Sequence, residues 1–118
     1  MRKFLLAVTI LLLAAPWAAA QDFDTDVPMG WAVVPGDGVE TTTGGAGGEV
    51  VTATSASELS SYASDATPRI IMVQGTLSGS TINVGNNKTI IGVGSDATLD
   101  GCQLNMNGNE NIIIRNLT

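Results

Sequence analysis

The 118-residue sequence has no histidine, a single cysteine and few aromatic residues. Without histidine, this stretch cannot form a Ser-His or Cys-His nucleophile pair or a His/Cys zinc site. Basic residues are also scarce, since only Arg69, Lys88 and Arg115 oppose eleven Asp and Glu residues beyond residue 20. Binding to nucleic acids and anionic membranes depends on Lys and Arg, so we expect neither as a partner of the mature chain.

Long apolar runs are absent after residue 20. At the start, two basic residues precede an apolar segment at 4–15, and Ala18-Ala19-Ala20 supplies small residues for cleavage. The apolar segment is shorter than the roughly 20 residues that a membrane-spanning helix needs. The pattern predicts a secretory signal peptide over 1–20 and a secreted, extracellular protein that begins at Gln21.

The only cysteine is Cys102, in a segment (97–106) with strand and turn residues. In a secreted chain it is either buried as a small apolar residue or paired with a cysteine outside this sequence, and we favour burial.

Residues 21–48 are rich in Asp, Pro and Gly, which predicts an irregular segment. Its glycine run, Gly44–Gly48, lacks the Gly-Lys-Ser/Thr ending of a phosphate-binding loop and the spacing of a dinucleotide fingerprint. We interpret the run as a tight turn or a place of close packing.

A short helix is predicted after a strand at 49–53. Ser55 and Glu58 have the spacing of a capping box, and apolar residues follow at intervals of three and four. We expect the helix over about 56–65, with Leu59 and Tyr62 packed on the first coil, because Pro68 disfavours its continuation.

The rest of the chain consists of short β-rich segments separated by Gly, Asn, Asp and Ser, at 69–73, 81–84, 89–93, 97–99, 104–106 and 111–117. Residues 81–91 align with 104–114, a repeat of 23 positions typical of a parallel β-solenoid. The alignment predicts that Asn86 lies beside Asn109, Ile90 beside Ile113 and Ile91 beside Ile114.

The last strand should alternate, with Arg115 toward solvent, Ile112 and Ile114 inward and Ile113 outward. The sequence stops directly after this apolar strand, whereas solenoids need several coils and a cap. We therefore expect an N-terminal fragment with three parts: 1–20 (signal peptide), 21–48 (irregular) and 49–118 (cap and first coils).

No constellation of catalytic residues is present. The carboxylates of the repeat region, Asp96, Asp100 and Glu110, stand singly on predicted turns and are interpreted as solvated. The segment around Asp100 lacks the acidic spacing of a calcium loop. Asn87 and Asn116 each begin a glycosylation sequon.

The chain resembles the family 1 pectate lyases. Four segments occur in the order found in that family: Thr42–Gly48 followed by Val50–Thr52, then Thr67–Leu77, Val84–Gly94 and Asn111–Leu117. The resemblance implies an all-β fold, a right-handed parallel β-helix with a short N-terminal capping α-helix, of which only the first coils are present. It also implies a secreted enzyme that cleaves polygalacturonate by calcium-dependent β-elimination and is a monomer at full length.

The family's calcium ligands and catalytic arginine lie beyond the segment matched by Asn111–Leu117. We therefore assign no catalytic, cofactor-binding or metal-binding residue here, and Arg69 and Arg115 belong to structural segments. The fragment alone is expected to be inactive. Two alternatives stay open: a pectin lyase, which acts on methylated substrate without calcium, and a non-catalytic β-helical protein that binds polysaccharides or lies on a surface.

Overall fold

The computed structural model describes residues 33–36, 38 and 40–118. The predicted signal peptide and the acidic start of the mature chain lie outside the described residues. Within the described ranges no helix is both long and apolar enough to cross a membrane.

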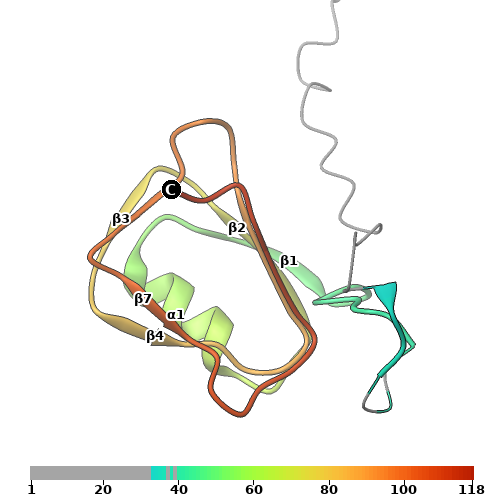
Figure 1. Ribbon diagram of the computed structural model, residues 1–118. Coiled ribbons are helices and arrows are strands. Elements are labelled where there is room, and N and C mark those ends of the chain that lie inside the picture. Colours follow the sequence, from blue (N-terminus) through green and yellow to red (C-terminus); the bar gives the residue numbers. More distant parts are fainter. Residues whose placement is uncertain (1–32, 37, 39) are drawn as a thin grey trace, which may run out of the picture.

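Every strand pairing among the described residues is parallel, and together the strands form the coils of an incomplete parallel β-helix (Figure 1). One side of the coil is a four-stranded sheet in the order β1-β2-β5-β8, and the other two sides are the pairs β3-β6 and β4-β7. The elements are β1 (Glu49–Ala53), α1 (Ala56–Ser64), β2 (Arg69–Val73), β3 (Thr76–Ser78), β4 (Thr81–Asn83), β5 (Lys88–Gly92), β6 (Thr98–Asp100), β7 (Gln103–Asn105) and β8 (Ile112–Arg115). The sequence analysis overlooked β3.

Helix α1 closes one end of the coil and contacts β1, β2 and β4 (Figure 1). The predicted cap is present, since the Glu58 amide donates to the Ser55 hydroxyl at 3.2 Å and the Glu58 carboxylate accepts from the Thr54 amide at 2.8 Å. Leu59 and Ala63 are fully buried, and Tyr62 is half-buried against the same core. The prediction of a helix packed on the first coil is therefore confirmed.

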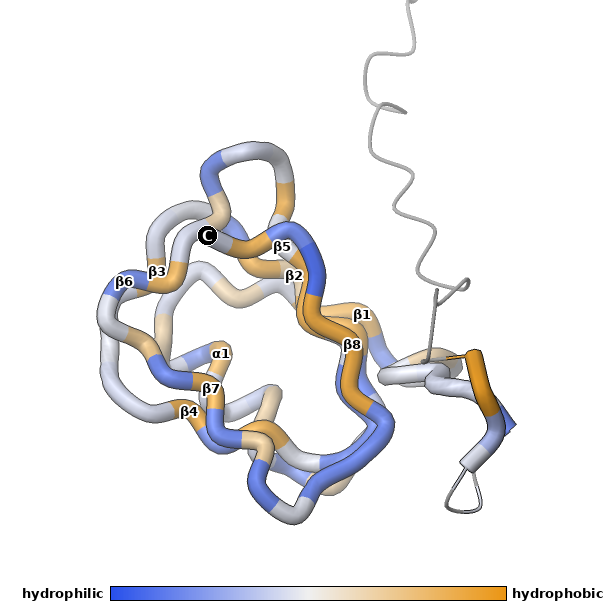
Figure 2. Tube along the Cα trace, in the orientation of Figure 1, coloured by the Kyte–Doolittle hydropathy of each residue, from blue (hydrophilic) through white to orange (hydrophobic). Residues whose placement is uncertain are grey.

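The core is a stack of aliphatic side chains inside the coil. Ile71 of β2 pairs with Ile90 of β5, which pairs with Ile114 of β8, and the first two are fully buried. Figure 2 shows these apolar strands in successive layers, with polar residues concentrated in the connections. Each fully buried side chain of this size contributes about 1.5–3 kcal/mol through loss of apolar contact with water.

The predicted adjacency of the two repeats is confirmed, but the predicted offset of 23 residues is wrong by one residue in both strand pairs, β4–β7 and β5–β8. Thr81 pairs with Gln103, an offset of 22, whereas Lys88 pairs with Ile112, an offset of 24. The connection between β7 and β8 (106–111) is two residues longer than that between β4 and β5 (84–87). The 23-residue alignment averaged these two offsets.

The side chains of β8 point to the two faces of the sheet as predicted, but the inward Ile114 is partly exposed and the outward Ile113 is buried. Ile114 continues the inward row of Ile71 and Ile90, yet it is 36% exposed because no described strand lies beyond β8. Ile113 belongs to the outer row with Thr89, yet it is only 8% exposed because the glycine segment around Gly44 lies over it.

Candidate functional site

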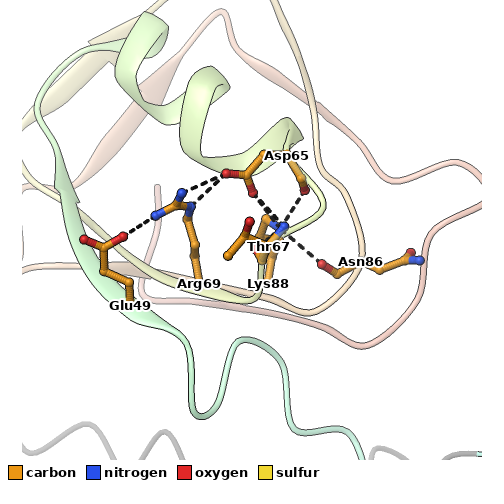
Figure 3. Close-up of polar contacts among 6 residues, drawn as sticks. All are labelled: Glu49, Asp65, Thr67, Arg69, Asn86 and Lys88. Atoms are coloured by element: carbon orange, nitrogen blue, oxygen red, sulfur yellow. Dashed lines mark hydrogen bonds and ion pairs between the residues drawn. The ribbon is translucent and has the colours of Figure 1, made fainter.

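A cluster of charged side chains joins the end of α1 to the first residues of β1, β2 and β5 (Figure 3). The Arg69 guanidinium binds the Asp65 carboxylate at 2.9 Å and the Glu49 carboxylate at 2.5 Å. It also lies 5.8 Å from the centre of the Tyr62 ring, within the range of a cation–π contact. Glu49 and Arg69 come together because β1 and β2 pair in parallel at these residues.

Lys88 is the fully buried member of the cluster. Its ammonium group donates to the carbonyl oxygens of Asp65 at 2.9 Å, Thr67 at 2.6 Å and Asn86 at 3.2 Å, and it lies 3.3 Å from an Asp65 carboxylate oxygen. A buried ammonium group must be paired and hydrogen-bonded to be tolerated, and here it is both. Lys88 thus supplies a hydrogen-bond donor to the carbonyl groups of Asp65 and Thr67, which come directly after α1. Carbonyl groups at the end of a helix have no amide of a following turn to bind.

The pKa shifts in this cluster stabilise the charged forms of Asp65 and Arg69, which suits a structural ion pair better than a group that transfers protons. Burial by itself would raise the pKa of Asp65, but hydrogen bonds from Arg69, the Thr67 amide and Lys88 outweigh it and lower the pKa. The hydrogen bond to Asp65, followed by that to Glu49, raises the pKa of Arg69. A general base must be unprotonated near the working pH, and the raised pKa keeps Arg69 protonated, so Arg69 does not fit that role. This agrees with its assignment to a structural segment.

Two stacked asparagines connect the coils at the corner before β5 and β8. Asn87 and Asn111 both have a φ of 57°, and the Asn111 amide nitrogen donates to the Asn87 amide oxygen at 2.7 Å. The Asn111 amide oxygen accepts from the backbone amides of Thr43 at 2.7 Å and Gly44 at 2.9 Å. The hydrogen-bonded pair is thus the next asparagine of each coil rather than Asn86 and Asn109, which were predicted to lie side by side and which line the same cavity.

The glycine run crosses the outer face of the four-stranded sheet. The Gly45 amide donates to the buried Thr89 hydroxyl at 2.8 Å. A Cβ atom on Gly44 would collide with the Thr89 hydroxyl, and one on Gly45 would collide with the Arg69 carbonyl group. Close packing, one of the two reasons predicted for this glycine run, is thus observed at Gly44 and Gly45.

A cavity of about 260 Å³ lies beside the charged cluster. Its walls are the end of α1 (64–66), the turn at 85–87 and Asn109. The walls carry amide and hydroxyl groups together with Asp65, whose charge is already compensated by Arg69 and Lys88. This arrangement offers polar contacts but no free ionised group.

The structure does not bring the remaining carboxylates together. Asp96 and Glu110 are exposed outside the strands, and Asp100 is the exposed last residue of β6 rather than a turn residue. No group of three or more potential metal ligands occurs within the described part of the chain. The described residues therefore do not fit a calcium site.

The single cysteine and both sequons are part of the packed coil. Cys102 is unpaired, half-buried against the core and oriented toward the Leu77 carbonyl oxygen at 3.5 Å. The side-chain amide nitrogen of Asn116 donates to the carbonyl groups of Gly92 at 2.8 Å and Gly94 at 2.7 Å. Arg115 is half-buried.

Sequence analysis missed the charged cluster. The available signal was that Glu49, Arg69 and Lys88 each begin a predicted strand or immediately precede one. In-register parallel strands align their first residues, so three charges at equivalent positions must meet. The partner from the helix end, Asp65, could be placed only by the tertiary fold.

Comparison with known proteins gives a consistent set of relatives, although no protein-family model matches the chain. The pectate trisaccharide-lyase of Thermotoga sp. (strain RQ2) is 38% identical over 117 residues, covering 96% of this chain and 31% of the relative. The pectate lyase plyB of Emericella nidulans is 35% identical over 121 residues, covering 97% and 36%. A pectin lyase of Bacillus subtilis is 35% identical over 81 residues, covering 65% and 24%.

A solved structure has the same fold. The pectate lyase of Bacillus sp. N165, crystallised in complex with trigalacturonate, superimposes with a TM-score of 0.65 at 30% identity and covers 77% of this chain and 33% of that chain. The chain spans about a third of the length of the relatives that cover nearly all of it.

Proposed function

Because this chain is a pectate lyase-like polypeptide, we propose that it forms the N-terminal cap and first coils of a secreted enzyme that depolymerises polygalacturonate by calcium-dependent β-elimination. The observation that carries the proposal is the similarity of nearly the entire chain to pectate lyases, at 35–38% identity. Trigalacturonate, the ligand of the structural neighbour, is a short segment of this polymer.

The described residues supply the scaffold for this activity. Helix α1 and the cluster of Asp65, Arg69 and Lys88 close the coil at one end. The next coils of a longer protein would stack on β8 and continue the same sheets. The calcium ligands and the arginine base are proposed to lie outside these 118 residues, so no step of the reaction is placed on the residues described above.

The test compares two proteins in one assay. The full-length protein and the isolated segment 21–118 are given polygalacturonate, and the ultraviolet absorbance of unsaturated uronide is followed with and without a calcium chelator. We expect chelator-sensitive product formation from the full-length protein and none from the segment. Turnover by the segment would show that the active site lies within it, and an inactive full-length protein that still binds the polymer would support the non-catalytic alternative.

A pectin lyase is the second candidate, and the similarity to the Bacillus subtilis pectin lyase favours it. The same assay separates the two, because a pectin lyase would act on methylated substrate and its activity would survive the chelator. Preference for unmethylated polygalacturonate would exclude this candidate.

A further inference from the structure

The loop between β7 and β8 contains an asparagine unlike the other seven in the chain. Asn107 is the only asparagine followed by glycine. The side chains of the others are all held by hydrogen bonds in the structure, at positions 83, 86, 87, 105, 109, 111 and 116. Among the described residues the Asn107 side chain finds no hydrogen-bond partner, and only its backbone amide and carbonyl groups are engaged.

The neighbouring glycine completes the geometry. The Asn109 amide donates to the Met106 carbonyl oxygen at 3.0 Å, which places Asn107 and Gly108 at the two central positions of a β-turn. Gly108 has a φ of 75°, and a Cβ atom there would have no neighbour within 4 Å. The Gly108 amide donates no hydrogen bond within the described part of the chain. A free amide nitrogen and a free side-chain amide thus stand next to each other on an exposed turn.

We propose that Asn107 is a site of spontaneous modification at which the chain deamidates through a cyclic imide. The Gly108 nitrogen loses its proton to solvent base and attacks Cγ of Asn107, and the new C–N bond closes a five-membered ring as ammonia leaves. Water then opens the ring at either carbonyl carbon, giving aspartate or isoaspartate. The balance is one water consumed, one ammonia released and one negative charge gained.

The position of the loop allows this reaction to proceed in the folded protein. The loop contains the two residues by which the β7–β8 connection exceeds the β4–β5 connection, and it projects from the coil (Figure 1). Asn107 and Gly108 are exposed and belong to no strand pair. Ring closure therefore requires no unfolding of the core, and the product should accumulate as an acidic variant. This inference does not depend on the proposed function.

The experiment follows the full-length protein during incubation at mildly alkaline pH. Trypsin releases a peptide covering 89–115 with four asparagines, and fragmentation spectra together with enzymatic isoaspartate labelling locate the change. We expect near-complete conversion at Asn107, with the other seven asparagines retained and a rate that rises with pH. The Asn107→Gln variant should not form the acidic species, whereas Asn109→Gln, which removes an asparagine from the same loop, should form it.

A synthetic peptide covering 103–113 serves as the unrestrained reference. The proposal predicts comparable rates in the peptide and in the folded protein. It is overturned if Asn107 stays intact while the peptide is converted, if another asparagine reacts first, or if Asn107→Gln still yields the same acidic species.

Discussion

At the scale of single residues, Lys88 connects the capping helix to the second coil. It is the first residue of β5, is fully buried, and binds three carbonyl oxygens as well as the Asp65 carboxylate. Burying a charge is costly, so the buried ammonium group of Lys88 is tolerated only while its hydrogen-bond and ion-pair partners are present. A single substitution at this corner is therefore expected to be strongly destabilising.

We expect Lys88→Met to lower the free energy of unfolding by about 3 kcal/mol, because it leaves three carbonyl groups without this donor and removes one of the two cations that bind Asp65. Denaturant unfolding of the full-length protein measures the change. A double-mutant cycle with Asp65→Asn provides the control, since the two losses should be less than additive if the residues interact. A change within about 0.5 kcal/mol, the usual range for surface substitutions, would contradict the assigned role.

The lowered pKa of Asp65 predicts a loss of stability in acid. Its pKa in the folded protein lies below the ordinary value of 3.8, so its contribution is fully present above that pH and is lost as pH falls through the folded-state pKa. The stability of wild-type protein should therefore decrease in this window more steeply than that of Asp65→Asn. Thermal midpoints recorded over a series of acidic buffers measure the difference, and parallel curves for the two proteins would refute it.

At the scale of elements, the glycine segment is a cover for the outer face of the four-stranded sheet. Its backbone is held by Thr89 and Asn111, and it buries Ile113. The segment fits only because its residues have no side chains at the points of contact. The inward and outward alternation of side chains along β8 therefore does not translate into exposure, since the outer face is covered at Ile113 as well.

Substitution of Gly45 should detach this cover. In Gly45→Ala the new Cβ atom would collide with the Arg69 carbonyl group, so we expect the segment to lift from the sheet and expose Thr89 and Ile113. Faster amide hydrogen exchange in β8 and easier proteolysis between residues 40 and 48 would report this. Gly36→Ala is the matched control, because a Cβ atom there meets nothing within 4 Å. Equal protection in the two variants would refute the prediction.

At the scale of the whole molecule, the two ends of the coil differ. Both β1 and β8 pair on only one side within the described residues, but helix α1 packs at the β1 end, whereas no described element covers β8 and its partly exposed Ile114. An open strand edge beside apolar side chains is a template for pairing with another chain. The relatives that match nearly all of this chain are about three times its length.

The isolated segment 21–118 should consequently associate in solution, and the full-length protein should not. Sedimentation velocity over a range of concentrations measures this. Ile114→Lys should reduce association of the segment by placing a charge beside the edge, while Val50→Lys, at an exposed apolar residue of the capped end, serves as the control. A segment that stays monomeric, or equal effects of the two substitutions, would contradict the account.

Much of the fold was predictable from local patterns. The capping box and apolar spacing located α1 to within a residue, and the bounds of β1 and β2 agree with those predicted because β-rich runs ended there at turn residues. The missed strand β3 consists of Thr76, Leu77 and Ser78, a sequence too short and too polar to stand out. Local propensity is informative only where several residues agree.

The sequence alone determined the class of fold, the helix and the adjacency of the repeats, because hydrophobic periodicity and capping act between near neighbours in the chain. Only the tertiary structure decided the register, the burial of Ile113 and the charged cluster at Lys88. Register depends on how many residues each connection takes up, and burial depends on segments that return from far along the chain. Both are properties of contacts between distant residues, which no local pattern records.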